Sequence, residues 1–319
     1  MSHPQHVVLG AGTIGTTIAE QLAAAGEPVR LVSRSGHSPG IAGVEAVAAD
    51  LTNPVAVRAA AAGAHVAYFA CQPAYTDWPK GFPPLAEGVL GGLAGTGTRL
   101  AVVDNLYMYG PTDGRPITED LPYAATTRKG VARARLAERF LAAHRVGDVP
   151  VVIARASDYF GPRGVTSSAG DRFFPPILAG KSVQVFGDAD TPHAFTFVPD
   201  FARTLIELGR RDEALGEAWH VPTAPAVSQR RFAEMAAAAA GVPAPKLSRM
   251  TKPMLRLAGL FVPAAREIIE MAYEFEEPFL LDCSKIERAF GLQPTPLDEA
   301  LVETVAWWRG GAIDDEAAA

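Results

Sequence analysis

The feature that constrains this fold most is a glycine turn near the start of the chain. Residues 10–15 read Gly-Ala-Gly-Thr-Ile-Gly, directly after the apolar run Val7–Leu9 and at the start of a segment with helical spacing, Thr13–Ala25. At a strand-to-helix turn, such glycines allow a tight bend, backbone approach to a pyrophosphate, and close helix–strand packing. The first N–H groups of the helix favour the same anion. An ordinary glycine turn is the alternative; otherwise the turn predicts a dinucleotide site contacted by Gly10, Gly12, Thr13, Ile14 and Gly15.

From residue 6 to about 155, short apolar runs alternate with alanine-rich segments of helical spacing, which is typical of βαβ units. The runs are Val7–Leu9, Val29–Val32, Val44–Ala48, Val66–Ala70, Leu100–Val103 and Val149–Ala154. Runs that are apolar at every position imply parallel strands covered on both faces. After residue 155 the chain turns to Gly- and Pro-containing loops, with short strands expected at Val183–Phe186 and Phe195–Val198.

The pattern predicts an α/β protein with two lobes, in line with a length of 319 residues. A Rossmann-like, doubly wound parallel sheet occupies residues 1–165, completed by part of 190–225. A smaller C-terminal α+β lobe at 166–313 serves the substrate, and 314–319 form a loose tail. The apolar segment Met254–Met271 either lines a pocket of this lobe or belongs to its core.

Composition excludes several classes of protein. The net charge is −6 and the basic residues are scattered, so no nucleic-acid partner is expected. The two cysteines, Cys71 and Cys283, lack metal-ligand spacing, and we expect no metal. With no signal peptide and no apolar run long enough to span a bilayer, we expect a cytoplasmic protein without membrane contact.

The ends of the next three strands predict how the rest of the nucleotide is held. Where an NAD site usually presents a carboxylate to the ribose, this chain has Ser33 and Arg34, which suit a 2′-phosphate. NADP(H) is therefore expected over NAD(H), unless Arg34 is merely a solvated loop residue. Further cofactor contacts are expected from Asp50 and Leu51 at the adenine, and from Ala70, Cys71 and Gln72 beneath the cofactor. Asp50 has an equally good interpretation as a turn residue, and Cys71 as a small packing residue.

Together with the glycine turn, several segments resemble extended short-chain dehydrogenase/reductases: residues 103–110, 154–162 and 197–202. Residues 281–285, 290–295 and 304–308 are similar to the end of the NAD(P)-dependent epimerase/dehydratase branch of that superfamily. The resemblance spans nearly the whole chain. It implies a Rossmann-like sheet, a small C-terminal substrate lobe and a homodimer through helices near 84–93 and 126–144. The second of these helices is unusually basic for a buried interface, so a monomer is equally open.

The chain departs from this superfamily at the residues that move protons. The Tyr-x-x-x-Lys pair is missing, and the same spacing reads Lys129-Gly-Val-Ala-Arg133. Two cations one helical turn apart would invite an anion, such as a cofactor phosphate or a substrate carboxylate. Asn105 stands where the superfamily keeps a Ser or Thr. We therefore expect Tyr107 or Lys129 to donate the proton and Asn105 to hydrogen-bond a carbonyl oxygen, with Lys129 also near the cofactor.

Other residues are candidates for the substrate pocket: Tyr75, Trp78, Asp158, Tyr159 and His193. Asp158 resembles a contacting Asn of relatives, or else pairs with Arg155, and His193 has a core or surface interpretation. Few charges and many aromatic residues favour a small, rather apolar or aromatic carbonyl or alcohol and an NADP(H)-dependent oxidoreductase. A nucleotide-sugar epimerase or dehydratase and a non-catalytic NADP-binding sensor remain as alternatives.

Overall fold

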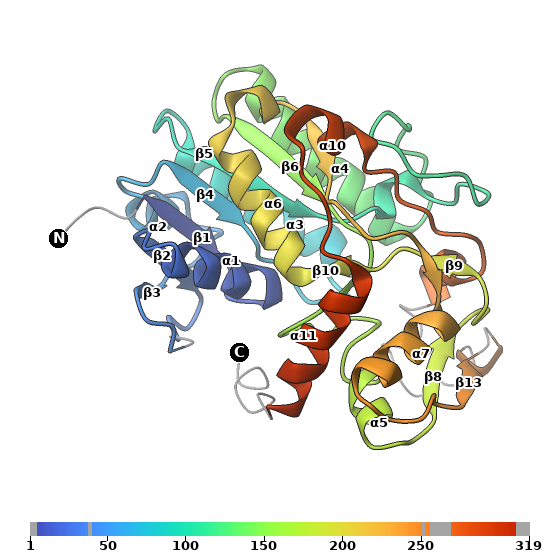
Figure 1. Cartoon of the computed structure of the whole chain (residues 1–319). Coiled ribbons are helices and arrows are strands. Elements are labelled where there is room, and N and C mark those ends of the chain that lie inside the picture. The colour runs from blue at the N-terminus through green and yellow to red at the C-terminus, as the bar shows by residue number, and fades with distance from the viewer. Residues whose placement is uncertain (1–4, 38–39, 251–252, 256–268, 311–319) are drawn as a thin grey trace.

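The computed structural model describes residues 5–37, 40–250, 253–255 and 269–310. Most of the apolar segment 254–271 and the whole tail 314–319 lie outside these residues. Figure 1 shows a large lobe built on one sheet and a smaller lobe carried by the C-terminal half of the chain.

The large lobe is a seven-stranded sheet in the order β11-β6-β5-β4-β1-β2-β3, and every neighbouring pair is parallel. In chain order the strands are β1 (His6–Leu9), β2 (Val29–Ser33), β3 (Val44–Ala48), β4 (Val66–Phe69), β5 (Arg99–Asp104), β6 (Val151–Arg155) and β11 (Ala218–His220). The order reverses direction at β1, which is the doubly wound arrangement, so the fold class predicted from the sequence is confirmed. Ligands of such sheets bind at the carboxyl edge near that reversal.

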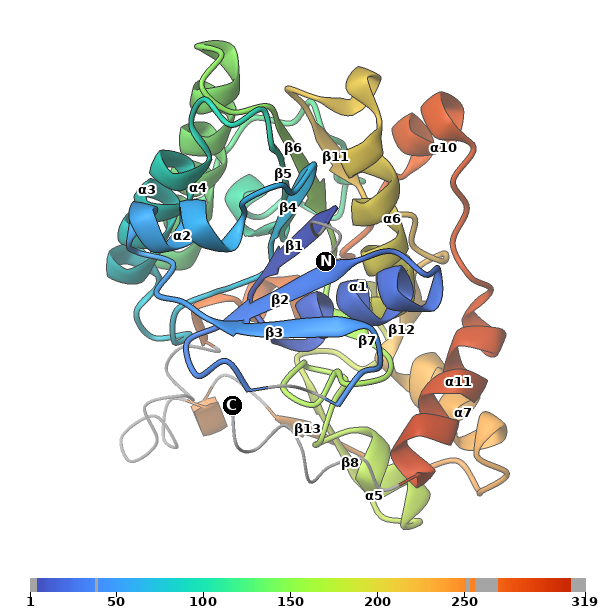
Figure 2. The same cartoon turned by 90° about the vertical axis from the view of Figure 1, so that its left-hand side faces the viewer.

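Helices cover both faces of the sheet (Figure 2). One layer holds α2 (Pro54–Ala60), α3 (Trp78–Leu93) and α4 (Arg128–Arg145), and the other holds α1 (Thr13–Ala24) and α6 (Val198–Arg210). Local sequence sets their starts. Asn53 accepts hydrogen bonds from the N–H groups of Val55 and Ala56 and so caps α2, and Thr127 caps α4 through the Gly130 N–H.

The strand expectations hold in the centre of the sheet and fail at its edge. Strands β1, β4 and β6 are buried at every position, as their apolar runs predict. Strand β3 is not: it lies at the edge, and none of its residues is fully buried. The strand expected from Val149 begins at Val151, after Pro150, which has no N–H to donate. The strand expected at Phe195–Val198 is shorter, because helix α6 already begins at Val198, with Pro199 in its first turn.

The smaller lobe has its own aromatic core. Its elements are β7 (Tyr159–Phe160), α5 (Phe174–Leu178), β8 (Val183–Phe186), β9 (Pro192–His193), β10 (Thr196–Phe197), β12 (Val227–Ser228), α7 (Gln229–Ala239), β13 (Leu247–Met250) and α11 (Leu297–Arg309). Helix α10 (Ser284–Phe290) packs instead on the large lobe, beside β11. Short 3₁₀ turns are η1 (Tyr107–Tyr109), η2 (Asp212–Ala214) and η3 (Ala272–Phe275). Phe160, Phe173, Phe174 and Phe232 pack together beneath α11. Within the described residues, no helix is both long and apolar enough to cross a membrane.

Candidate functional site

The glycine turn has the geometry that a bound pyrophosphate requires. Gly10 has φ +123°, and a Cβ there would lie 2.7 Å from the backbone of Ala70 and Cys71. A Cβ on Gly15 would lie 1.9 Å from the Gly10 carbonyl oxygen. Gly12 is different: it is exposed, it caps α1 without a side chain, and nothing lies within 4 Å of its Cβ position. The first N–H groups of α1 are thus open to an anion, and these residues fit a dinucleotide.

A loop of the second lobe reaches the start of α1. The Thr13 hydroxyl donates to the carbonyl oxygen of Arg163 at 2.8 Å, and the Arg163 guanidinium pairs with Glu20 further along the helix. Arg163 has φ +63°, a conformation that side chains rarely adopt. Ile14 is buried in the core between α1 and α6, so only its backbone can face a ligand.

The expected ribose and adenine contacts lie at the ends of β2 and β3. Arg34 is exposed, and the Ser33 hydroxyl accepts the N–H of Gly36 at 2.9 Å. Asp50 accepts from both the N–H and the hydroxyl of Thr52, and these bonds lower the pKa of its carboxyl. Asp50 therefore forms a local turn that leaves it exposed, while Leu51 is buried.

The end of β4 passes close to the glycine turn. Ala70 packs against Gly10 and Gly15, and burial raises the pKa of the Cys71 thiol to about 12. Such a thiol carries almost no thiolate near neutral pH, which agrees with a packing role. Gln72 is exposed and its side-chain oxygen lies 3.4 Å from Arg133.

Lys129 stands where the superfamily keeps its tyrosine, and an acidic residue of the second lobe holds it. Its ammonium lies 3.1 Å from the Glu270 carboxylate, which also accepts the Lys129 backbone N–H at 2.8 Å. The side chain is 2% exposed and lies over the ring of Tyr75 at 4.4 Å. The anion expected beside Lys129 is therefore supplied by the chain itself. Glu270 was not found from the sequence, because no local pattern links it to α4.

Arg133 stands where the superfamily keeps its lysine, and it is buried against Asp104. Its guanidinium lies 3.4 Å from one carboxylate oxygen of Asp104 and 4.3 Å from the centre of the Trp78 ring. The other oxygen of Asp104 accepts from Arg155 at 3.3 Å. The pairing of Asp158 with Arg155 that the sequence left open is therefore wrong, because Arg155 turns into the sheet edge toward Asp104. The sequence signal for this network is Asp104, a carboxylate at the end of the apolar run of β5.

The candidate proton donor Tyr107 lies in the middle of an aromatic cluster at the carboxyl edge of β5. Its ring is 5.8 Å from Trp78, which in turn contacts Tyr75 at 5.0 Å. Burial raises the pKa of Tyr107 well above its usual value, and the nearby Glu274 carboxyl raises it further. Asn105 accepts the Tyr107 backbone N–H at 3.2 Å and so shapes the turn that presents this phenol.

The opposite wall of the cluster comes from three distant segments. Asp158 accepts from the Nε2 side of His193 at 2.9 Å, and the His193 Nδ1 lies 3.0 Å from the carbonyl oxygen of Glu274. The charges of Glu274 and Asp158 raise the pKa values of Tyr75 and Tyr107, so this wall lies near the aromatic cluster. The structure thus brings together Tyr75, Trp78, Tyr107, Lys129, Asp158 and His193. Tyr159 is half-buried on β7 and packs toward the core between α1 and α6.

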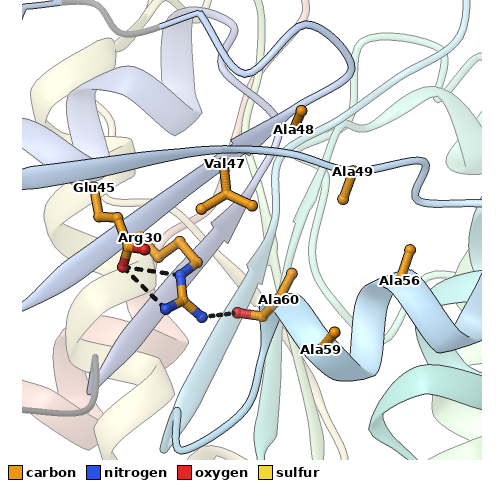
Figure 3. A pocket seen from close by; sticks show the side chains of 8 residues that line it. All are labelled: Arg30, Glu45, Val47, Ala48, Ala49, Ala56, Ala59 and Ala60. Atoms are coloured by element: carbon orange, nitrogen blue, oxygen red, sulfur yellow. Dashed lines mark hydrogen bonds and ion pairs between the residues drawn. The ribbon is translucent and has the colours of Figure 1, made fainter.

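Two surface hollows lie elsewhere. The first, between β3 and α2, is lined mostly by alanines, and its two charged residues, Arg30 and Glu45, pair with each other (Figure 3). The second is lined by residues beside β11, among them Tyr123, Lys285 and Arg288. Neither includes a residue of the aromatic cluster. Among the described residues, no group of three or more His, Cys, Asp or Glu side chains is placed to hold a metal ion.

Comparison with known proteins agrees with this architecture. The model of the NAD dependent epimerase/dehydratase family matches residues 97–221. A dTDP-glucose 4,6-dehydratase of Actinoplanes sp. is 28% identical over 199 residues, 62% of this chain. The chain belongs to the extended short-chain dehydrogenase/reductase superfamily. The resemblance predicted from the sequence is thereby confirmed. The chain spans about half, 54%, of the length of the Actinoplanes relative.

Solved structures of the superfamily share the fold along nearly the whole chain. A UDP-glucuronic acid 4-epimerase from Bacillus cereus in complex with NAD superposes with a TM-score of 0.75 at 16% identity, covering 96% of this chain and 98% of that one. The dTDP-glucose 4,6-dehydratase DesIV from Streptomyces venezuelae, a double mutant with NAD and DAU bound, gives 0.74 at 18% identity, covering 95% and 96%. At these identities the likeness shows the fold. The proteins of the matched family are enzymes, and those two structures hold NAD.

Proposed function

We propose that the protein is an NADP(H)-dependent enzyme that reduces the carbonyl group of a small, rather apolar or aromatic molecule. The observation that carries this proposal is the state of Tyr107. The phenol lies at the carboxyl edge of the sheet, beside the position where the superfamily acts on its substrates, and its surroundings keep it protonated. A bound reduced nicotinamide would supply the hydride.

The direction of the reaction follows from the charges around this phenol. Reduction of a carbonyl needs a proton for the oxygen, whereas oxidation of an alcohol needs a base to remove one. The charges that act most strongly on Tyr107 come from Glu274, Tyr75 and Asp158, all of which oppose its ionisation. Tyr107 therefore stays protonated and is not available as a base, so alcohol oxidation is the disfavoured direction.

The preference for NADP(H) rests on the end of β2. Arg34 is exposed there, and no described residue is placed to pair with its guanidinium, so it is available to a 2′-phosphate. The structures of relatives hold NAD, so this preference distinguishes the chain from them.

A panel of aryl ketones and aldehydes tests the proposal, with NADPH oxidation and product formation followed together. We expect reduction of a subset of the panel and a loss of about a hundredfold or more in kcat for Tyr107→Phe, with little change in NADPH affinity. The matched control is Tyr159→Phe, on the other side of the sheet edge, which should change kcat by less than about threefold. Tight NADPH binding without oxidation by any carbonyl would overturn the reductase and favour a cofactor-binding sensor.

The relatives favour a second candidate, a nucleotide-sugar epimerase or dehydratase, and they favour it more directly than the reductase. That chemistry begins by oxidising the sugar, which needs a base where this chain has a protonated phenol and a lysine held by Glu270. The two candidates differ in stoichiometry. An epimerase or dehydratase converts dTDP-glucose or UDP-glucuronic acid without net consumption of nicotinamide, whereas the reductase consumes one NADPH per product.

A further inference from the structure

Two buried histidines of this protein differ in the partners of their second ring nitrogen. His220 donates from Nδ1 to the carbonyl oxygen of Asp282 at 2.8 Å, and its Nε2 lies 3.1 Å from the Tyr109 hydroxyl. That hydroxyl accepts from Arg155, so its own hydrogen is free to point at Nε2. One hydrogen on the ring therefore satisfies both contacts, and burial lowers the pKa of His220 to about 3.

His193 cannot be satisfied in the same way. Its Nδ1 faces the carbonyl oxygen of Glu274, which only accepts, so Nδ1 carries a hydrogen. Its Nε2 lies 2.9 Å from Oδ2 of Asp158, and a carboxylate also only accepts. A hydrogen must therefore lie between Nε2 and Oδ2, bonded either to the ring or to the carboxyl. Together the two side chains hold one proton more than a neutral imidazole and a carboxylate would.

The surroundings shield the imidazole ring of this pair from solvent. The ring of His193 is 1% exposed and lies between aromatic rings at 4.6, 4.7 and 5.2 Å, those of Phe275, Phe195 and Phe279. Asp158 is the outer member of the pair, with 18% of its side chain exposed, and it acts electrostatically on Tyr75, Tyr107 and Tyr273. The ring of His193 is thus closed to water, and Asp158 is the partly exposed member of the pair.

A neighbouring carboxyl adds to the acidity of this wall. Glu274 is 2% exposed, and none of the described residues is a hydrogen-bond partner of its Oε1. Burial raises the pKa of Glu274 well above its usual value, and the charge of Asp158 raises it further. Burial thus keeps Glu274 protonated, while the nearby Glu270 side chain pairs with Lys129.

We propose that the Asp158–His193 pair is a second proton donor of the active site, serving a substrate atom other than the carbonyl oxygen that Tyr107 serves. Asp158 is the catalytic residue and His193 positions it. The inference rests on the proposed reductase. A saturated ketone needs one donor, so a second one indicates a substrate that also takes a proton at carbon, a conjugated enone.

The reaction balances with the groups present and the cofactor already proposed. A bound NADPH would supply a hydride to the β-carbon, and the π electrons of the double bond would then form an enolate, whose oxygen Tyr107 is placed to hydrogen-bond. The Asp158–His193 pair then gives its proton to the α-carbon, and the electron pair of the broken bond stays on the donor. The products are the saturated ketone and NADP⁺, and the pair regains a proton from solvent. Elimination of water is disfavoured, because it also needs a free base to remove a C–H proton.

The first experiment tests the extra hydrogen in the protein without substrate or cofactor. NMR of protein labelled with ¹⁵N in its histidine rings is recorded, and His193→Gln identifies the signals of interest. We expect two slowly exchanging hydrogens at His193, one at Nδ1 and one between Nε2 and Oδ2. Asp158→Asn should leave one, because its amide can donate to a neutral Nε2. Identical spectra for the wild type and Asp158→Asn would overturn the shared proton.

The second experiment tests the catalytic role with a matched pair of probes, benzylideneacetone and its saturated analogue benzylacetone. Asp158→Asn should slow reduction of the conjugated probe about a hundredfold and that of the saturated probe less than about threefold, with unchanged NADPH affinity. Tyr107→Phe should slow both. Equal losses on both probes in Asp158→Asn would overturn the second donor and leave the reductase standing. Reduction of neither probe by the wild type overturns both, while the NMR signals still report on the pair.

Discussion

Replacing Asp104 with asparagine should lower the free energy of unfolding more than breaking any exposed ion pair among the described residues would. Its side chain is 2% exposed and is shared by two buried guanidinium groups, Arg133 at 7% and Arg155 at 1% exposure. Asp104→Asn keeps the shape but leaves two cations with no counter-charge. Breaking a buried ion pair by removing one partner costs about 3–5 kcal/mol, because the remaining charge stays desolvated. We expect a loss in that range.

The matched control is Glu87→Gln, which breaks the bond with Arg139. That pair is shorter, at 2.6 Å, but its side chains are 60% and 42% exposed, so its loss should cost less than about 1 kcal/mol. Urea unfolding followed by tryptophan fluorescence measures both variants. At a slope of about 3 kcal/mol per molar, Asp104→Asn should lower the midpoint by roughly 1–1.7 M. Equal midpoints for the two variants would refute the reasoning that burial, and not distance, decides the energy.

Three further predictions concern the buried groups and the glycine turn. Because burial raises the pKa of Glu274, the folded protein keeps a proton that the unfolded chain loses above about pH 4.5. The free energy of unfolding should therefore fall by about 1.4 kcal/mol per pH unit as the pH rises above that value. In urea titrations, Glu274→Gln should flatten this slope, whereas the exposed control Glu213→Gln should not. Because burial lowers the pKa of His220 to about 3, stability is lost as pH falls below about 6.5, and His220→Gln should flatten the acid limb by up to about 4–5 kcal/mol; an unchanged limb would contradict this. Gly15→Ala should weaken nucleotide binding at least about tenfold in a fluorescence titration, because its Cβ would lie 1.9 Å from the Gly10 carbonyl oxygen, whereas Gly26→Ala at the far end of α1 should bind normally.

The sequence predicted the parts of this fold that depend on local patterns. The glycine turn and the apolar central strands each follow from residues within one element, and the structure contains them where they were expected. Strand β3 is less buried than expected. It lies at the edge of the sheet, and an apolar run cannot show whether a neighbouring element covers the strand. Two strand boundaries differ from those predicted: Pro150 precedes the start of β6, and Pro199 lies in the helix that follows β10.

The candidate site was predictable only in part. Tyr107, Lys129, Asp158 and His193 follow the carboxyl ends of strands or stand at motif positions, so sequence could single them out. Their partners could not be found in this way. Glu270 and Glu274 come from a segment more than 100 residues after α4, and only the tertiary fold places them against Lys129 and Tyr107. Asp158 was expected to contact substrate or cofactor or else to pair with Arg155, and its partner in the structure, His193, could not be found from the sequence.

The central claim is that this carboxyl edge binds a nicotinamide dinucleotide with the 2′-phosphate recognised by Arg34. Titration of the purified protein with NADPH and NADH, followed by the fluorescence of the reduced nicotinamide, tests it most directly in the wild type and in Arg34→Ala. We expect NADPH to bind more tightly than NADH, and Arg34→Ala to weaken NADPH binding by roughly ten- to a hundredfold while leaving NADH nearly unchanged. Binding of neither nucleotide, in a folded protein, would contradict the account.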